Sequence, residues 1–135
     1  MTPPRAAAAP SARAAAFLAD SHLGTLTTLR PDGSPHVTAV RFTWNPAAGL
    51  ARVLTVASSR KVRNVVHRGA GRVALCQVSG PRWITLEGTA TVSDDPARVG
   101  DGVRAYRGRY RSLPPVRPGR VVMEIAVDRI LTLNL

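Results

Sequence analysis

Two serines and two cations stand side by side in Ser58-Ser59-Arg60-Lys61, and Asn64 follows one helical turn later. The segment opens a short helical pattern after an apolar run, so one of its serines can cap a helix. A helix N-terminus presents free backbone N–H groups and the positive end of the helix dipole, which together favour an anion. Charge-assisted hydrogen bonds to a phosphate would contribute about 1.5–3 kcal/mol each. We predict a phosphate site formed by these five residues; an ordinary capped helix with solvated cations is the alternative.

The remaining polar residues predict no acid–base pair and no metal site. The three histidines, at positions 22, 36 and 67, have neither paired spacing nor a cysteine partner, so zinc is not expected. His36 follows a turn and is expected to be an ordinary edge residue. No nucleophile elbow, Walker loop or dinucleotide fingerprint occurs. If the chain is an enzyme, we expect a cofactor to carry its chemistry.

The composition favours a single domain that binds an anion. The chain has 135 residues and a formal net charge of +11, from 19 Lys+Arg against 8 Asp+Glu. The arginines are scattered rather than clustered, and Lys61 is the one lysine. A small polyanionic molecule is therefore favoured over nucleic acid, which stays as the alternative. No apolar run approaches the roughly 20 residues of a membrane span, so no membrane partner is expected.

Hydrophobic periodicity predicts an α+β fold with an antiparallel β-barrel core. Six strands joined by short turns close most simply as a small barrel. Residues 11–135 are expected to form this one domain. Residues 1–10 are rich in proline and alanine and lack the apolar core of a secretory signal, so we expect a disordered tail and a cytoplasmic protein. Strands are expected over residues 23–30, 35–44, 50–56, 72–78, 82–92 and 120–128, which residues 130–133 can extend, and helices over 11–21, after 58, and over 95–110.

Three local patterns make sharper predictions. Val62, Val65 and Val66 are expected to share the buried face of the helix that follows the serine pair. Gly88 interrupts an alternating strand, which indicates a bulge or bend. A four-residue stripe at helical spacing is expected to pack the last helix on the sheet, and it consists of Val99, Val103, Tyr106 and Tyr110.

The order of several motifs resembles the split β-barrel superfamily. These motifs are LGTLTTLRPDGSPHV at residues 23–37, the Ser59-Arg60-Lys61 triplet with Asn64, and Trp83 four residues before Glu87-Gly88. The likeness covers roughly residues 17–130. The superfamily includes the pyridoxamine phosphate oxidases and the deazaflavin oxidoreductases of actinobacteria. Within it, the chain is most similar to the actinobacterial F420-dependent biliverdin reductases, through FLADSHLGTLTTLR, ARVLTVASSRK and YRGRYRSLPPVRPGRVVMEI.

The resemblance implies a homodimer with two cofactors between its subunits. It implies that Ser59, Arg60 and Lys61 hold the cofactor phosphate, with Ser58 and Asn64 beside them. The cofactor ring would lie along the second strand, and Trp83 would reach in from the other subunit. Arg41, in the middle of that strand, is a candidate for orienting an anionic substrate. The strand residues implied in ring binding are Val37, Thr38, Ala39 and Val40.

The resemblance leaves two cofactors and more than one function open. FMN and F420 share a tricyclic ring, a ribityl chain and a phosphate, and F420 adds a polyglutamate tail that suits a chain of charge +11. The favoured expectation is an F420H2-dependent reductase that converts biliverdin to bilirubin. The alternatives are an FMN- or F420-binding protein with another substrate, or a cofactor carrier without turnover. Pyridoxamine phosphate oxidases close their active site with a C-terminal Trp and Arg-x-His segment; it is missing from the printed chain, so that activity is not expected.

Overall fold

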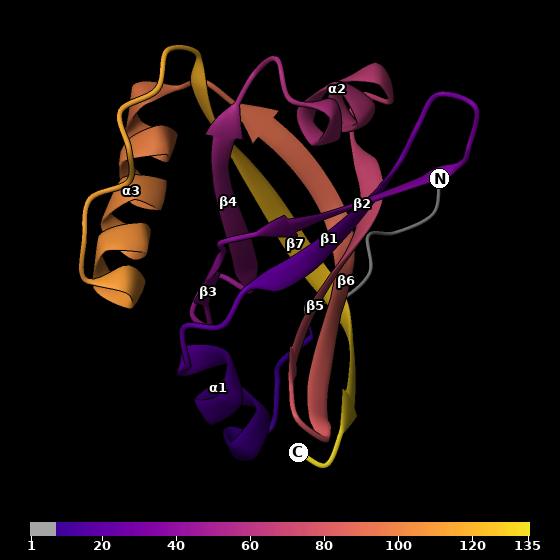
Figure 1. Cartoon of the computed structure of the whole chain (residues 1–135), viewed down its shortest axis with the longest axis vertical. Helices are drawn as coiled ribbons and strands as arrows, with labels where there is room; N and C mark the ends of the chain where they lie inside the picture. Colours follow the sequence, from indigo (N-terminus) through magenta and orange to yellow (C-terminus); the bar gives the residue numbers. More distant parts are fainter. Residues whose placement is uncertain (1–7) are drawn as a thin grey trace.

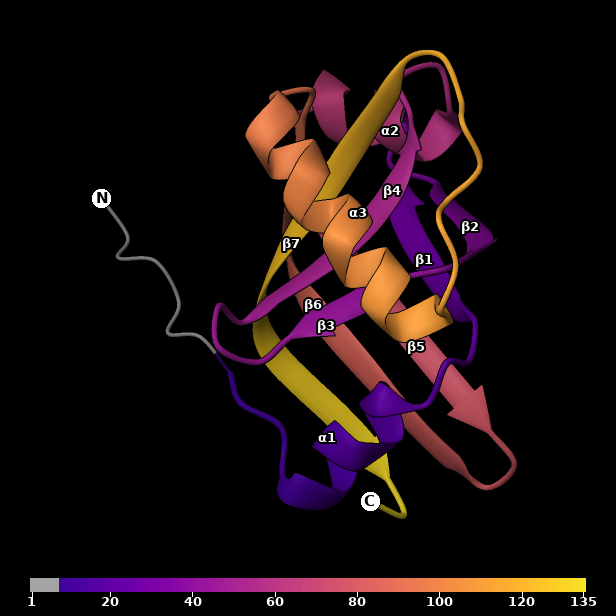
Figure 2. The ribbon, with the colours of Figure 1, turned by 90° about the vertical axis from the view of Figure 1, so that its left-hand side faces the viewer.

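The computed structural model describes residues 8–135, which form one curled antiparallel sheet with three helices around it (Figures 1 and 2). The seven strands follow the order β2-β1-β5-β6-β7-β4-β3. This arrangement confirms the α+β split-barrel prediction. The elements are α1 (Ala12–Ala19), β1 (Gly24–Leu29), β2 (Pro35–Val40), β3 (Thr43–Asn45), β4 (Leu50–Val56), α2 (Arg60–His67), β5 (Gly71–Ser79), β6 (Arg82–Ser93), α3 (Pro96–Tyr110) and β7 (Arg120–Leu133).

The sheet has seven strands rather than the predicted six because the strand expected over residues 35–44 is broken at Arg41 and Phe42. The Phe42 backbone N–H donates to the Tyr110 hydroxyl at 3.1 Å, and that hydroxyl donates to the Phe42 carbonyl at 3.0 Å. Bonds to a helix side chain thus replace the bonds of a strand ladder at this point. The two halves, β2 and β3, become the two edges of the sheet.

The two longest strands, β6 and β7, form the spine of the barrel. Their pairing shifts register between Glu87 and Gly88, which confirms the predicted bulge. A Cβ added at Gly88 would lie 2.1 Å from the Ala126 carbonyl oxygen. Glycine is required here because two backbones approach too closely for any side chain.

The helices close the ends and one face of the barrel. Phe17 and Leu18 of α1 are buried in the core, as are Val62 and Val65 of α2. The expectation for Val66 is wrong, since it is 57 % exposed. The buried face of α2 is rotated toward Asn64 instead, whose amide donates to Thr28 Oγ1 at 2.9 Å.

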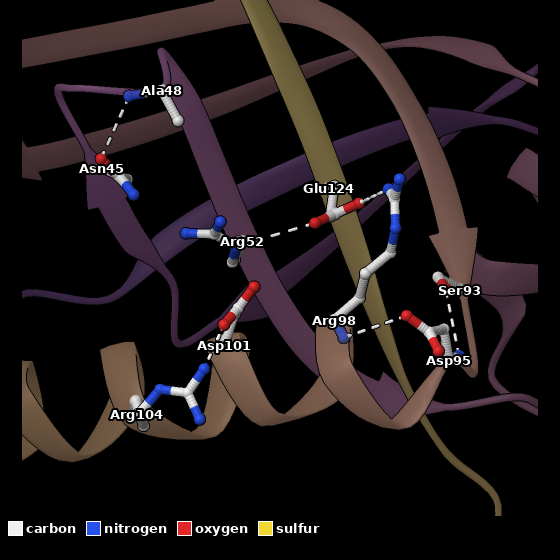
Figure 3. Close-up of polar contacts among 9 residues, drawn as sticks. All are labelled: Asn45, Ala48, Arg52, Ser93, Asp95, Arg98, Asp101, Arg104 and Glu124. Carbon is white, nitrogen blue, oxygen red and sulfur yellow. Dashed lines mark hydrogen bonds and ion pairs between the residues drawn. The ribbon is translucent and has the colours of Figure 1, made fainter.

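An ion cluster around the buried Glu124 carboxylate links α3 to β4 and β7 (Figure 3). Glu124 of β7 is 7 % exposed, and its carboxylate accepts a 2.6 Å hydrogen bond from Arg98 of α3. Arg52 of β4 approaches the other carboxylate oxygen at 3.8 Å. Asp95 caps the helix by accepting from the Arg98 backbone N–H. Of the stripe predicted on α3, Tyr106 is buried and Val99, Val103 and Tyr110 are half-buried, and Gly102 is the second buried residue of the helix.

The expected tail at residues 1–10 lies mostly outside the described residues. Where the description begins, the Ala8 backbone N–H donates to the Val127 carbonyl at 3.2 Å. No helix in residues 8–135 is long and apolar enough to cross a membrane. The same residues contain no group of three or more His, Cys, Asp or Glu that could hold a metal ion.

Candidate functional site

The site lies where the barrel is open, between β2 and the second half of β4. Strand β2 pairs only with β1, and β3 pairs only with residues 50–52 of β4. Residues 53–56 of β4 therefore have a strand partner on one side alone, which is β7. A cavity of about 510 Å³ occupies the opening. Its lining consists of Ala39, Val40, Arg41, Val53, Leu54, Thr55, Val56, Ser59, Lys61, Tyr106, Pro114, Pro115, Arg117 and Arg120.

The N-terminus of α2 meets one end of this cavity. Ser59 is the N-cap residue by position, but its side chain makes no capping hydrogen bond. Its hydroxyl donates to the Val56 carbonyl at 2.9 Å and lies 3.2 Å from Thr55 Oγ1. The expectation of a serine side-chain cap is therefore wrong. The N–H groups of the first turn are left for another acceptor, which is the condition an anion requires.

Among the predicted phosphate ligands, Lys61 gives the strongest structural indication of an anion site. Its side chain is half-buried at the cavity, and in the described part of the chain no carboxylate lies within 4.0 Å of it. Burial and the neighbouring Arg117 guanidinium lower the pKa of the Lys61 ammonium. Both effects make the charged form costly, and an anionic ligand would offset that cost.

The other predicted ligands divide into two groups. Ser58 and Arg60 are exposed beside the helix start and do not line the cavity. Asn64 is 1 % exposed and bonded to Thr28, so the structure places its side chain between α2 and β1 and away from the cavity. Of the five, Ser59 and Lys61 are brought together at the opening.

His36 belongs to the same cationic end, which the sequence interpretation as an ordinary edge residue missed. Its Nδ1 atom is buried and has no hydrogen-bond partner among the described residues. Partial burial and the Arg30, Arg60 and Lys61 cations lower the pKa of the His36 imidazole. Arg30 follows β1, and Arg60 and Lys61 begin α2, so the cations near His36 come from two elements. Of these residues only Lys61 lines the cavity, and the concentration of positive charge favours an anion beside the start of α2.

The wall formed by β2 carries part of the predicted ring site. Ala39 and Val40 line the cavity together with Arg41, which follows the strand. Val37 is exposed and Thr38 is half-buried, and neither lines the cavity. The free edge of β2 therefore offers backbone donors and acceptors beside an apolar floor.

The opposite wall was not predicted. This wall consists of Tyr106 of α3, the segment before β7 and the first residue of β7. The lining residues from the last two are Pro114, Pro115, Arg117 and Arg120. The sequence interpretation treated residues 113–119 as a connecting loop and Tyr106 as a packing residue. The signal that could have identified this wall is the pair of arginines among three prolines, a stiff segment that carries charge.

Arg41 is held by the tyrosines of α3. Its guanidinium donates to the Tyr106 hydroxyl at 2.6 Å. It also lies 5.9 Å from the Tyr106 ring centroid and 5.0 Å from that of Tyr110. These contacts fix a cation at the rim of the cavity.

The predicted residue Trp83 is not part of this opening in a single chain. It lies at the start of β6, paired with Val78 and Leu133. Figure 1 shows the β5–β6 turn at the end of the sheet remote from α2.

The charged side chains that line the cavity are all positive. Arg41, Lys61, Arg117 and Arg120 are the charged residues among those that line the cavity in residues 8–135, and no carboxylate joins them. Apolar strand residues complete the wall. The arrangement suits a planar molecule that carries several negative charges.

Comparisons with known proteins identify the family of the chain. The profile of the family described as pyridoxamine 5'-phosphate oxidase matches residues 11–134. An F420H(2)-dependent biliverdin reductase of Mycobacterium tuberculosis is 47 % identical over 118 residues, which are 87 % of this chain and 84 % of that protein.

Solved structures show the same fold. The conserved hypothetical protein Rv2991 of M. tuberculosis superposes with a TM-score of 0.77 at 27 % identity, covering 97 % of this chain and 89 % of that one. A protein described as an F420 reductase superposes with a TM-score of 0.68 at 23 % identity, covering 86 % and 94 %. By the extent of the family match and by the identity to a curated relative, the chain belongs to the pyridoxamine 5'-phosphate oxidase family.

Proposed function

We propose that this protein is an F420H2-dependent biliverdin reductase. The observation that carries the proposal is the cavity at the barrel opening, whose four cations face no carboxylate in the described part of the chain. Both proposed ligands are polyanionic: F420 has a phosphate and a glutamate tail, and biliverdin has two propionates. The identity of 47 % to an F420H(2)-dependent biliverdin reductase supports the choice of this pair over others.

The residues present fit F420. The uncapped start of α2, with Ser59 and the unpaired Lys61, supplies donors for a phosphate. The edge of β2 at Ala39 and Val40 supplies an apolar wall and free backbone groups for a tricyclic ring. Arg117 and Arg120 add charge for the tail or for the substrate propionates. When bound, the reduced deazaflavin supplies a hydride.

The chain's own contribution is positioning and charge. Two planar molecules must be stacked with their reacting atoms aligned, which favours a rigid slot between fixed strands. The walls of the slot are fixed because β2 and β4 are each paired with a neighbouring strand on their other side. Arg41, fixed by Tyr106, offers a cation to a propionate at the rim.

We also propose that the protein is a homodimer. The outer face of the β5–β6–β7 region exposes Val78, Leu131 and Leu133, and the strand register places Trp83 between Val78 and Leu133. A second copy covering this face would remove the apolar patch from water. The expected result from light scattering is a particle of twice the chain mass, which Leu133→Asp would reduce to one. A cytoplasmic location stays a prediction.

A fluorescence titration tests the proposed function. Purified protein is titrated with F420 and, separately, with FMN, and biliverdin is then added to the reduced complex. Preferential F420 binding, followed by loss of the bilin absorbance and growth of a bilirubin band, is the expected result. Binding of F420 without bilin turnover would move the function to another substrate or to cofactor carriage. Preference for FMN would contradict the cofactor assignment.

A further inference from the structure

The reduction leaves a proton to be supplied, and the hydroxyl of Tyr106 is placed to supply it. Tyr106 lines the cavity and is 8 % exposed. Its oxygen accepts the hydrogen bond from Arg41 at 2.6 Å, so its own hydrogen is directed elsewhere. No described residue accepts that hydrogen. A ligand in the cavity is the acceptor that remains.

The other lining groups are poorer proton donors to the substrate. The three arginines cannot release a proton in a protein, and none of the lining residues in the described chain is a carboxylic acid or a histidine. The Ser59 hydroxyl already donates to the Val56 carbonyl. Lys61 carries protons, but it lies at the start of α2, where the proposed function uses its charge for the cofactor phosphate.

We propose that Tyr106 is the acid that protonates the substrate, and that Arg41 is the positioning residue that stabilises the resulting phenolate. This inference rests on the proposed function. A hydride forms a new C–H bond at the central methine carbon of the tetrapyrrole, and the π electrons move to a neighbouring ring nitrogen. That nitrogen forms an N–H bond as the Tyr106 O–H bond breaks. The phenolate, paired with Arg41, then recovers a proton from water.

The guanidinium next to the phenol oxygen is what makes the transfer feasible. A charge-assisted hydrogen bond strengthens when its acceptor becomes an anion. The bond from Arg41 is already made before the reaction, so little reorganisation accompanies the development of charge. The second cation contact of Arg41, over the Tyr110 ring at 5.0 Å, holds the guanidinium in place.

Tyr110 provides a matched control on the same helix. Its ring lies 4.8 Å from that of Tyr106, but its hydroxyl is consumed by the backbone of Phe42, as donor and as acceptor. It does not line the cavity. Because the Phe42 ring stays buried in the core, Tyr110→Phe is expected to lower stability while the geometry of the opening persists.

The first experiment needs no cofactor. Biliverdin is titrated into wild type, Tyr106→Phe and Tyr110→Phe, and the dissociation constant and the absorption spectrum of the bound bilin are recorded. A hydrogen bond donated to a ring nitrogen shifts the bilin absorption. We expect the shift in wild type and Tyr110→Phe and its loss in Tyr106→Phe, with affinity changed by less than about threefold.

Steady-state reduction of biliverdin by F420H2 then measures the effect of the proton transfer on turnover. General acid catalysis contributes about 10²–10⁴-fold, so Tyr106→Phe is expected to reduce kcat by that factor with little change in KM. Tyr110→Phe is expected to stay within about threefold of wild type. Arg41→Met, at an exposed position, is expected to lower kcat about tenfold and to retain a solvent deuterium isotope effect.

The outcomes separate this inference from the proposed function. If wild type reduces biliverdin and Tyr106→Phe does so at the same rate with the same bilin spectrum, Tyr106 is not the acid. An Arg41→Met variant with wild-type kcat also overturns the inference, whether or not Tyr106→Phe folds. If wild type binds F420 and does not reduce biliverdin, the proposed function fails and the inference fails with it.

Discussion

The Lys61 ammonium gives the sharpest test of the cofactor site. Lys61→Met keeps most of the side-chain stem and removes the charge from the start of α2. A hydrogen bond to a charged group contributes about 1.5–3 kcal/mol, so the affinity for F420 is expected to fall roughly 10- to 150-fold. Arg63→Met is the matched control, because Arg63 lies on the same helix, is exposed and does not line the cavity.

Both variants lower the formal net charge from +11 by one unit, so general electrostatic attraction is held constant between them. Fluorescence titration with F420 at fixed ionic strength measures the two dissociation constants. If Lys61→Met binds within about twofold of Arg63→Met, the ammonium does not contact the ligand and the phosphate assignment is refuted.

The ligand-free protein gives a second measurement with a definite sign. Burial and Arg117 hold the pKa of Lys61 below its ordinary value of 10.5, so the unfolded chain binds this proton more tightly than the native one. Stability therefore rises with pH in the alkaline window below 10.5. Lys61→Met is expected to lose this rise, and its Tm at neutral pH is expected to be no lower than that of wild type.

Three further changes test the scaffold and the cationic end. Gly88→Ala places a methyl group against the Ala126 carbonyl and is expected to cost about 2–3 kcal/mol of unfolding free energy in urea titration. Glu124→Gln removes the charge that balances the guanidiniums of Arg52 and Arg98. Because Arg98 is partly exposed, the expected loss of unfolding free energy is about 2–3 kcal/mol, which is less than for a fully buried pair. An unchanged Tm would contradict a stabilising role of the cluster. The pKa of His36 lies below its ordinary value of 6.5 in the free protein, and a phosphate nearby would raise it, so F420 affinity is expected to increase as the pH falls toward the pKa of the free protein. His36→Gln should abolish that pH dependence, measured by fluorescence titration.

Local signals were enough to predict most of the fold. The alternation of β6 and β7 follows from period-two patterning, and Gly88 marks the bulge because a single residue interrupts it. Asp95 and Pro96 mark the start of α3 by cap chemistry that depends on adjacent residues only. These features could be read from the sequence because each depends on neighbours in the chain.

The features that the sequence did not reveal depend on distant partners. At the break after β2, the backbone of Phe42 bonds to the hydroxyl of Tyr110, which lies 68 residues away. Asn64 is buried by a bond to Thr28, 36 residues away. The Ser59 hydroxyl donates to the Val56 carbonyl, whereas the side chain of a helix N-cap accepts a hydrogen bond from the backbone. For the same reason Arg117 was expected to be a loop residue and Arg120 the first residue of a strand, and only the folded chain places both at the cavity that β2 also lines.

One structural cause accounts for both the opening and the cation at its rim. Because the chain leaves the sheet at Arg41 and Phe42, β3 pairs with only the first half of β4, and the second half stays open. The Phe42 ring, buried in the core, keeps the chain turned at this point, so its neighbour Arg41 is carried outward to the rim. There α3, fixed through its first turn to Glu124, brings Tyr106 against the guanidinium. The same break therefore exposes the strand edge for a planar ligand and delivers a cation and a phenol beside it.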